Sequence, residues 1–196
     1  MEIKVKKLKK SWLFDFSKTR LVSAIGILGI LVLILATALT GTKFTGAFGF
    51  KFIEEQLVYN CVTENLIAVS VMTGIFGLLA KKINRNAILI QVLNAVLISR
   101  LPFIILTLFN IDDFIRLIYI INLSKFRYEL YDFIIGDILL LLFFMVSAAL
   151  LIVFSIRLLY SGFTSAVGTI KPGYKLYFFV ALVIAEFLTK GIIWLL

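Results

Sequence analysis

Long uncharged apolar runs are the feature that most constrains how this chain can fold. Its 196 residues are 62% hydrophobic and only 16% charged, and the charges gather in short clusters between the runs. Soluble domains carry about 45–50% apolar and about 25% charged residues. A helix needs about 20 mostly apolar residues to cross a hydrocarbon core of about 30 Å. The sequence therefore predicts an all-α, polytopic integral membrane protein.

Five stretches are apolar enough to cross a bilayer: residues 21–39, 60–80, 87–109, 133–156 and 176–196. The start of the second stretch is the least defined, because the uncharged run between Glu64 and Lys81 is short for a full span. We therefore expect Glu64 to lie in the headgroup region. The chain thus divides into a basic lead, residues 1–20, and a five-helix transmembrane domain, residues 21–196. We expect the connections 40–57 and 110–132 to be interfacial turns or short reclining helices.

The distribution of Lys and Arg predicts the orientation, because positively charged short loops stay in the cytoplasm. With the N-terminus inside, thirteen basic residues lie in inner segments: seven before residue 21, three in 81–85, and then Arg157, Lys171 and Lys175. Five lie in outer segments: Lys43, Lys51, Arg116, Lys125 and Arg127. This bias predicts that the N-terminus is in and the C-terminus is out.

The basic lead contributes most to the formal net charge of +9. Apolar side chains, among them Val5 and Leu8, alternate with its lysines at roughly helical spacing. This pattern is typical of an amphipathic helix on an anionic inner leaflet, where each surface lysine contributes about 1 kcal/mol. The residues expected to bind the membrane surface are Lys4, Lys6, Lys7, Lys9, Lys10 and Trp12. A docking site for a cytoplasmic partner is the alternative, and nucleic acid is not an expected partner.

The residue types that are absent exclude several kinds of chemistry. The chain has no His and one Cys, so His-based triads, most zinc sites and intrachain disulfides are excluded. Ser161, Thr164 and Ser165 form a hydroxyl cluster, but no His stands ready to activate a nucleophile there. We therefore expect a non-enzymatic protein with no metal and no cofactor.

Four ionisable residues lie inside the predicted spans: Arg100, Asp137, Glu186 and Lys190. Counted along the helices, they reach similar depths in the outer half of the bilayer. Glu186 and Lys190 are also four residues apart, on one helix face. Because intramembrane charges are costly unless they are paired, we predict a neutral network that joins the last three spans.

Pro102 lies beside this network in the third span. A proline within a helix removes one backbone hydrogen bond, so it predicts a kink that opens a polar niche lined by Asn94, Ser99 and Arg100. Two interpretations are open. The network fixes the register of the helices and neutralises its own charges, or it serves as a proton or ion relay or as an anion-binding niche.

The order of several segments resembles the Yip-domain family of five-span, Rab-interacting membrane proteins and their bacterial relatives. After the basic lead come GIFGLLAKKINRNAILIQVLNA at the end of the second span and SRLPFIILTLF in the third. The fourth span runs into IRLLYSGFTSAVG, and the fifth begins with KPGYKLYFFVALVIAEF. The resemblance covers most of the chain and rests on the order and spacing of these segments together.

This resemblance implies a protein that acts through partners, with no catalytic residues to carry over. The long acidic and aromatic N-terminal region of the eukaryotic relatives is absent, which argues against Rab binding and points to a multi-pass bacterial inner-membrane protein. We expect a scaffold or accessory subunit of a membrane assembly such as a transporter, whose partner is another membrane protein or a second copy. The alternative is a small transporter, or a lipid- or ion-handling protein, that uses the charged network.

Overall fold

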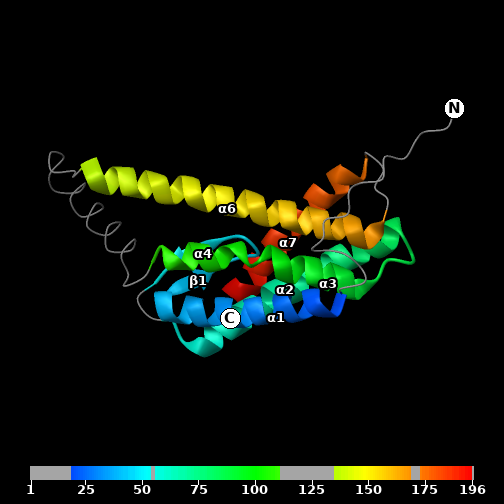
Figure 1. Cartoon of the computed structure of the whole chain (residues 1–196), viewed down its shortest axis with the longest axis horizontal. Helices are drawn as coiled ribbons and strands as arrows, with labels where there is room; N and C mark the ends of the chain where they lie inside the picture. Colours follow the sequence, from blue (N-terminus) through cyan, green and yellow to red (C-terminus); the bar gives the residue numbers. More distant parts are fainter. Residues whose placement is uncertain (1–18, 54–55, 111–134, 169–172, 196) are drawn as a thin grey trace.

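The computed structural model describes residues 19–53, 56–110, 135–168 and 173–195, without the side chains of residues 19 and 135–138. The elements are α1 (Thr19–Thr40), β1 (Thr42–Phe44), β2 (Phe50–Phe52), α2 (Val58–Ile83), α3 (Leu89–Ser99), α4 (Pro102–Leu108), α6 (Ile135–Val167) and α7 (Tyr174–Trp194) (Figure 1). The basic lead, with Lys4, Lys6, Lys7, Lys9, Lys10 and Trp12, and most of the 110–132 connection lie outside the described residues.

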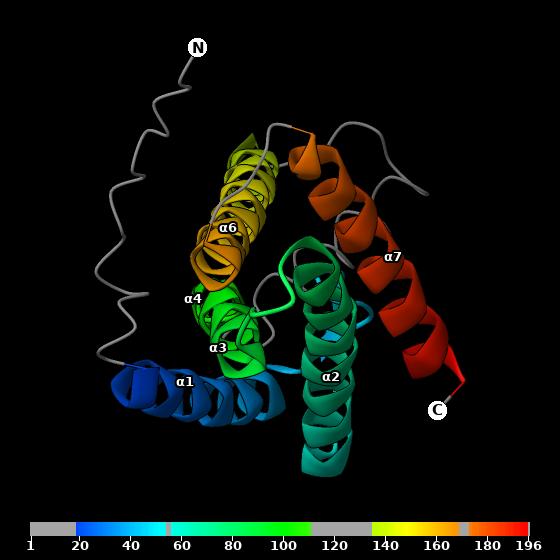
Figure 2. The same ribbon diagram turned by 90° about the vertical axis from the view of Figure 1, so that its right-hand side faces the viewer.

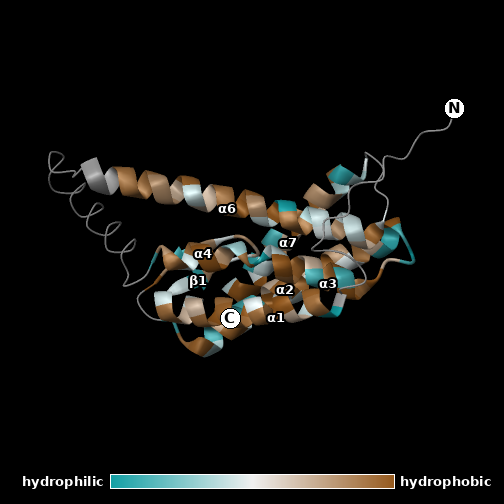
Figure 3. Ribbon diagram, viewed as in Figure 1, coloured by the Kyte–Doolittle hydropathy of each residue, from teal (hydrophilic) through white to brown (hydrophobic). Residues whose placement is uncertain are grey.

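Five helical segments of the described chain are long and apolar enough to cross a membrane: Arg20–Thr40, Val58–Ile83, Leu89–Leu108, Leu139–Val167 and Tyr174–Trp194. Apolar residues run along the helices, and hydrophilic ones gather at the connection between α2 and α3 (Figure 3). Each helix satisfies its own backbone hydrogen bonds, which a hydrocarbon environment demands. The predicted all-α class and the predicted number of apolar spans agree with these helices.

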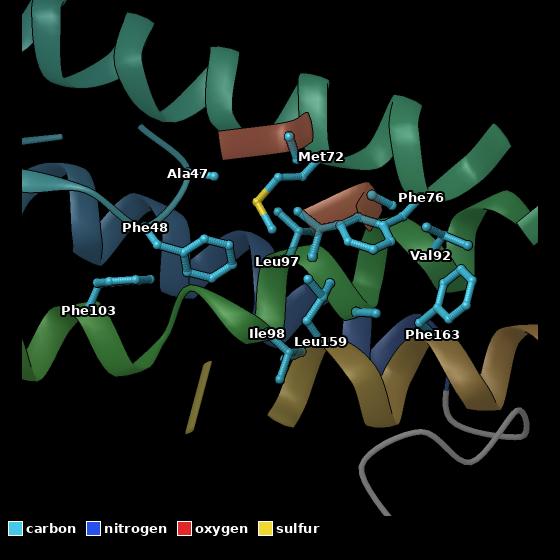
Figure 4. Close-up of a cluster of buried hydrophobic side chains, with 14 of the residues drawn as sticks. Ala47, Phe48, Met72, Phe76, Val92, Leu97, Ile98, Phe103, Leu159 and Phe163 are labelled. Atoms are coloured by element: carbon cyan, nitrogen blue, oxygen red, sulfur yellow. The ribbon is translucent and has the colours of Figure 1, made fainter. Parts of the chain in front are cut away.

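The span formed by α3 and α4 lies at the centre of the bundle. In the apolar 18-residue window of this span 61% of the residues are buried inside the protein, compared with 17% in that of the Leu139–Val167 span. Helices α1, α2 and α6 all pack against α3, whereas α7 packs mainly against α2 (Figure 2). Figure 4 shows the core where these helices meet, with Ile98 of α3 beside Leu159 of α6, and Val92 beside Phe163. Aromatic rings continue this core to α7, since Phe76 and Phe178 lie 5.1 Å apart.

The third span is interrupted at the proline. Helix α3 ends at Ser99 and α4 begins at Pro102, which leaves Arg100 and Leu101 between them. The carbonyl of Ile98 accepts a hydrogen bond from the backbone N–H of Leu101, a tighter turn than that of an α-helix. Pro102 has no backbone N–H with which to donate the regular helical bond to the Ile98 carbonyl. The break therefore follows from the sequence.

Residues 42–52 form a β-hairpin, so the expectation of an interfacial turn or reclining helix was wrong for this connection. Strands β1 and β2 pair antiparallel, with Thr42 opposite Phe52 and Phe44 opposite Phe50. The tip of the hairpin, residues 45–49, is closed by a hydrogen bond from Thr45 N–H to Gly49 O. Phe44 and Ala47 are fully buried, which places the hairpin among the helices. We call this end of the bundle the hairpin end.

The opposite end, which we call the basic end, carries exposed Lys81, Lys82, Arg85 and Lys175. Here α6 continues to Val167, beyond the residue 156 at which we expected its span to end. Its last turns stay helical because Leu159, Phe163 and Ala166 are buried at helical spacing. Gly168 ends the helix with a φ of 88°, a conformation that suits glycine.

Replacing Asn84 by alanine is expected to lower the free energy of unfolding by about 1 kcal/mol. The Asn84 side chain donates to the carbonyl of Val167 at 2.9 Å and so holds the end of α6. Thermal unfolding in mild detergent would measure the loss. Asn86→Ala, at an exposed position two residues away, is the control. Equal effects of the two substitutions would contradict a specific role of the Asn84 bond.

Candidate functional site

Arg100 is the largest fully buried side chain of the described structure, with 1% of it exposed. Its Nη1 donates to the carbonyl of Ala47 at 2.8 Å, and its Nη2 donates to Oδ1 of Asn65 at 3.2 Å. Arg100 itself lies at the break between α3 and α4. The first acceptor belongs to the hairpin tip, and the second belongs to α2. The Nε of Arg100 has no hydrogen-bond partner within the described residues.

Two phenyl rings complete the surroundings of the guanidinium. Its Cζ lies 4.8 Å from the ring centre of Phe44 and 5.5 Å from that of Phe103. The two rings pack edge to face, with their centres 5.5 Å apart. Electron-rich ring faces attract a cation most strongly where water is excluded. Arg100 is therefore stabilised without a directly bonded carboxylate.

One peptide group connects Arg100 to Glu186 of α7. The Ala47 carbonyl that accepts from Arg100 belongs to the same peptide as the Phe48 N–H, which donates to Oε2 of Glu186 at 2.8 Å. The carbonyl thus points to the cation and the N–H to the anion, so each charge strengthens the bond made to the other. The negative charge of Glu186 also stabilises the positively charged form of Arg100. We call Arg100, the Ala47–Phe48 peptide and Glu186 the peptide bridge.

Two glycines let the Glu186 carboxylate approach the hairpin tip. A Cβ placed on Gly46 would collide with Oε1 of Glu186, and one placed on Gly49 would lie 3.1 Å from the same oxygen. Gly46 does not adopt a positive φ in this structure. It is therefore the absence of a side chain, and not a special backbone conformation, that the site requires at Gly46.

A second carboxylate, that of Glu64 on α2, holds the first strand. It accepts from the backbone N–H of Phe44 at 3.2 Å and from Nε2 of Gln56 at 2.8 Å. Lys43 forms an ion pair with it, with Nζ and Oε1 separated by 3.5 Å. The side chain of Glu64, which we expected in the headgroup region, is only 6% exposed and is therefore enclosed by protein beneath the hairpin.

The structure treats the four predicted network residues differently. Arg100 and Glu186 meet the same peptide, from opposite sides. Lys190 is exposed, and no ion pair involves it in the part of the chain that is described. Asp137 belongs to α6, but its side chain is outside the described residues. The described members therefore form a bridged pair, while Lys190 stands apart from it.

The predicted polar niche at the helix break does not gather its residues around Arg100. Asn94 accepts a hydrogen bond from Ser23 of α1 at 2.9 Å. Ser99 donates to the carbonyl of Val96 in its own helix at 2.7 Å. Pro102 produces the break, and the guanidinium at that break turns to the hairpin and to α2. Asn94 and Ser99 thus serve helix packing, and Arg100 has other partners.

Sequence analysis missed the hairpin and the contributions of Glu64 and Asn65. Residues 42–52, TKFTGAFGFKF, place Lys43 between Thr42 and Phe44, and Lys51 between two phenylalanines, on either side of a glycine-containing turn, which is a hairpin signal. Each strand has only three residues, so the alternation is too short to outweigh the expectation of a surface loop.

No group of three or more His, Cys, Asp or Glu that could hold a metal occurs among the described residues. The arrangement positions and neutralises charge, and it presents no activated nucleophile. Comparisons with protein-family models, curated proteins and solved structures found no match.

Proposed function

We propose that the protein is a non-enzymatic membrane protein that serves as an accessory subunit or scaffold of a membrane assembly. The proposal places it in a bacterial inner membrane, with its N-terminus in and its C-terminus out. The positive-charge bias and the resemblance to the Yip-domain family support this placement. Its basic lead binds anionic lipid, and its apolar helices bind another membrane protein.

The observation that carries the proposal is that the described buried charges are engaged in holding the fold. Arg100 and Glu186 are joined through the hairpin tip, and Glu64 is paired with Lys43 and bonded to β1. A transporter keeps charged groups accessible to its substrate along a path through the membrane. Here the guanidinium is 1% exposed and two phenyl rings lie against it.

Helix α6 offers an extensive apolar surface for a partner. In the apolar 18-residue window of its Leu139–Val167 span, only 17% of the residues are buried inside the protein. Large apolar side chains are exposed along it: Leu139, Leu142, Phe143, Met145, Val146, Leu150, Val153 and Phe154. Helices associate in membranes through van der Waals packing, hydrogen bonds between helices and the entropy of the lipids. We infer that the partner packs against this face of α6.

One observation favours the alternative, an ion-handling protein. Among the described residues, the buried Nε of Arg100 has no hydrogen-bond partner, and an unpaired cationic donor can bind an anion. Purified protein in liposomes would test this alternative by the flux of a small anion such as chloride. Flux that disappears in Arg100→Lys, with the protein still folded, would favour it over the accessory role.

Photo-crosslinking in cells at native expression tests the accessory role. A photoreactive residue at Leu150 or Val153, both on the exposed face of α6, should give one discrete adduct with another membrane protein, identifiable by mass spectrometry. The same residue at Leu28 or Leu35 on the exposed face of α1 is the control and should not give this adduct. An adduct of twice the chain mass, or no protein adduct from α6, would count against the proposal.

A further inference from the structure

The two ends of the bundle differ in the balance of their described charges. Helix α1 begins at the basic end and runs toward the hairpin (Figure 1). The exposed cations of the basic end are Arg20, Lys81, Lys82, Arg85 and Lys175. The described carboxylates, those of Glu64 and Glu186, both bond to the hairpin at the opposite end. Within the described residues no ion pair neutralises the cations of the basic end, so its described side chains present a net positive charge.

The connection between α2 and α3, which carries most of these cations, has a fixed backbone. The carbonyl of Asn84 accepts from the backbone N–H of Ala87 at 2.9 Å, and its Oδ1 accepts from that of Asn86 at 3.0 Å. The Nζ of Lys81 donates to the carbonyl of Arg85 at 3.1 Å. Ala87 is buried in the core. The backbone is therefore positioned before a partner binds, which lowers the cost of binding.

Large apolar side chains are exposed beside the cations of this connection. Leu78 lies one helical turn before Lys82, on the same face of α2, and is exposed. Ile88 and Leu89, where α3 begins, are also exposed. Leu89 lies beside α2, since a Cβ placed on Gly77 would be 3.1 Å from its Cδ2. The hydrophilic connection thus adjoins apolar helix surface (Figure 3).

This combination of charge and apolar surface fits a phospholipid with an acidic headgroup. Arg85 can donate two N–H groups to one phosphate, and Lys82 adds a compact positive charge. The acyl chains of the same molecule would cover the exposed apolar side chains, which is favourable. Inorganic phosphate or nucleic acid would match the charge, but neither would cover the apolar side chains.

We propose that the α2–α3 connection is a binding site that prefers anionic over zwitterionic phospholipid. Lys82 and Arg85 hold the headgroup phosphate, and the acyl chains lie against Leu78. The site belongs to the helical bundle and is separate from the basic lead. This inference requires that the helices lie in a bilayer, but it does not depend on the proposed accessory role.

Quenching of tryptophan fluorescence by phospholipids brominated on their acyl chains tests the site. Trp12→Phe and Trp194→Phe remove the native fluorophores. In this background Leu78→Trp places a reporter beside the connection, and Val58→Trp places a reference reporter on α2 at the hairpin end, where Val58 is exposed. Bilayers of brominated phosphatidylglycerol and unbrominated phosphatidylcholine, mixed in both leaflets, give the relative binding constant of the two lipids at each reporter.

Phosphatidylglycerol should bind at least about fivefold more strongly than phosphatidylcholine at the Leu78→Trp reporter, the contribution of one basic residue near an anionic lipid. The two lipids should bind nearly equally at the Val58→Trp reporter. Higher salt should reduce the preference at Leu78→Trp, because salt screens exposed charges.

Two matched double substitutions locate the preference, both read at the Leu78→Trp reporter. Lys82→Gln with Arg85→Gln should abolish it. Lys51→Gln with Lys190→Gln removes the same charge from exposed positions at the hairpin end and should preserve it.

Three outcomes would overturn the site. Equal preferences at the two reporters would indicate a general attraction of anionic lipid to a chain with a formal net charge of +9. No preference at Leu78→Trp would leave the cations without a lipid partner. A preference that survives Lys82→Gln with Arg85→Gln would exclude these residues as its cause. The comparison of the two reporters decides the question even if this double variant fails to fold.

Discussion

Arg100→Leu is expected to lower the free energy of unfolding by about 3–5 kcal/mol, the cost of removing one partner of a buried charge pair. The substitution leaves the carbonyl of Ala47 and Oδ1 of Asn65 without their donor. It also leaves the carboxylate of Glu186 without its counter-charge. No water reaches these acceptors easily, because the Arg100 side chain that they surround is 1% exposed. Reversible unfolding in mixed detergent micelles, followed by helical circular dichroism, would measure the loss.

Three further variants identify the cause of that loss. Arg100→Lys keeps the charge, but its donors lie on one nitrogen and cannot reproduce the planar fork of the guanidinium that reaches both acceptors. The loss in free energy of unfolding should therefore be intermediate. Arg100→Leu combined with Glu186→Leu removes both charges, so the loss should be smaller than the sum of the single losses. Lys190→Met removes an exposed cation from a predicted span and should stay within about 0.5 kcal/mol of the unmodified protein. Strict additivity of the two leucine substitutions would refute the peptide bridge.

The helices could be predicted from hydrophobicity alone, because a backbone in hydrocarbon must bond within its own helix. The break of the third span could also be predicted, since Pro102 excludes one helical hydrogen bond. Helix α6 continues to Val167, beyond residue 156, where the fourth span was predicted to end. Charge at Arg157 suggested an end at residue 156, but Leu159 and Phe163 lie on the side of α6 that packs on the core. A single exposed charge does not end a helix whose opposite face is buried.

Arg100 and Glu186 could be found from sequence because charged residues are rare and costly inside a membrane. Their partners could not be found in this way, since depth along a helix says nothing about rotation. Burial of Ala185 and Thr189 against α2 fixes the rotation of α7, and the hairpin tip then reaches Glu186. The spacing of Glu186 and Lys190 suggested a pair, yet the structure uses a backbone N–H as the partner of the carboxylate.

Gly46→Ala is expected to lower the free energy of unfolding by about 1.5–3 kcal/mol, the range for a hydrogen bond to a charged group. The new Cβ would occupy the position of Oε1 of Glu186. The Glu186 side chain is flexible enough to move, but its carboxylate would then lose the bond to Phe48 and its place opposite Arg100. The unfolding experiment in mixed micelles would measure the effect.

Two controls separate displacement of the carboxylate from a general effect of adding a methyl group to a glycine. Gly74→Ala, on α2, has no neighbouring atom within 4 Å of the new Cβ. It should be neutral, or stabilising by about 0.5–1 kcal/mol, because alanine loses less conformational entropy than glycine in a helix. In a Glu186→Ala background the Cβ of Gly46→Ala has room, so adding this substitution should cost almost nothing more. If Gly46→Ala costs the same with and without the Glu186 carboxylate, the close fit of the hairpin tip to Glu186 does not stabilise the fold, and the hairpin must be held by its aromatic contacts alone.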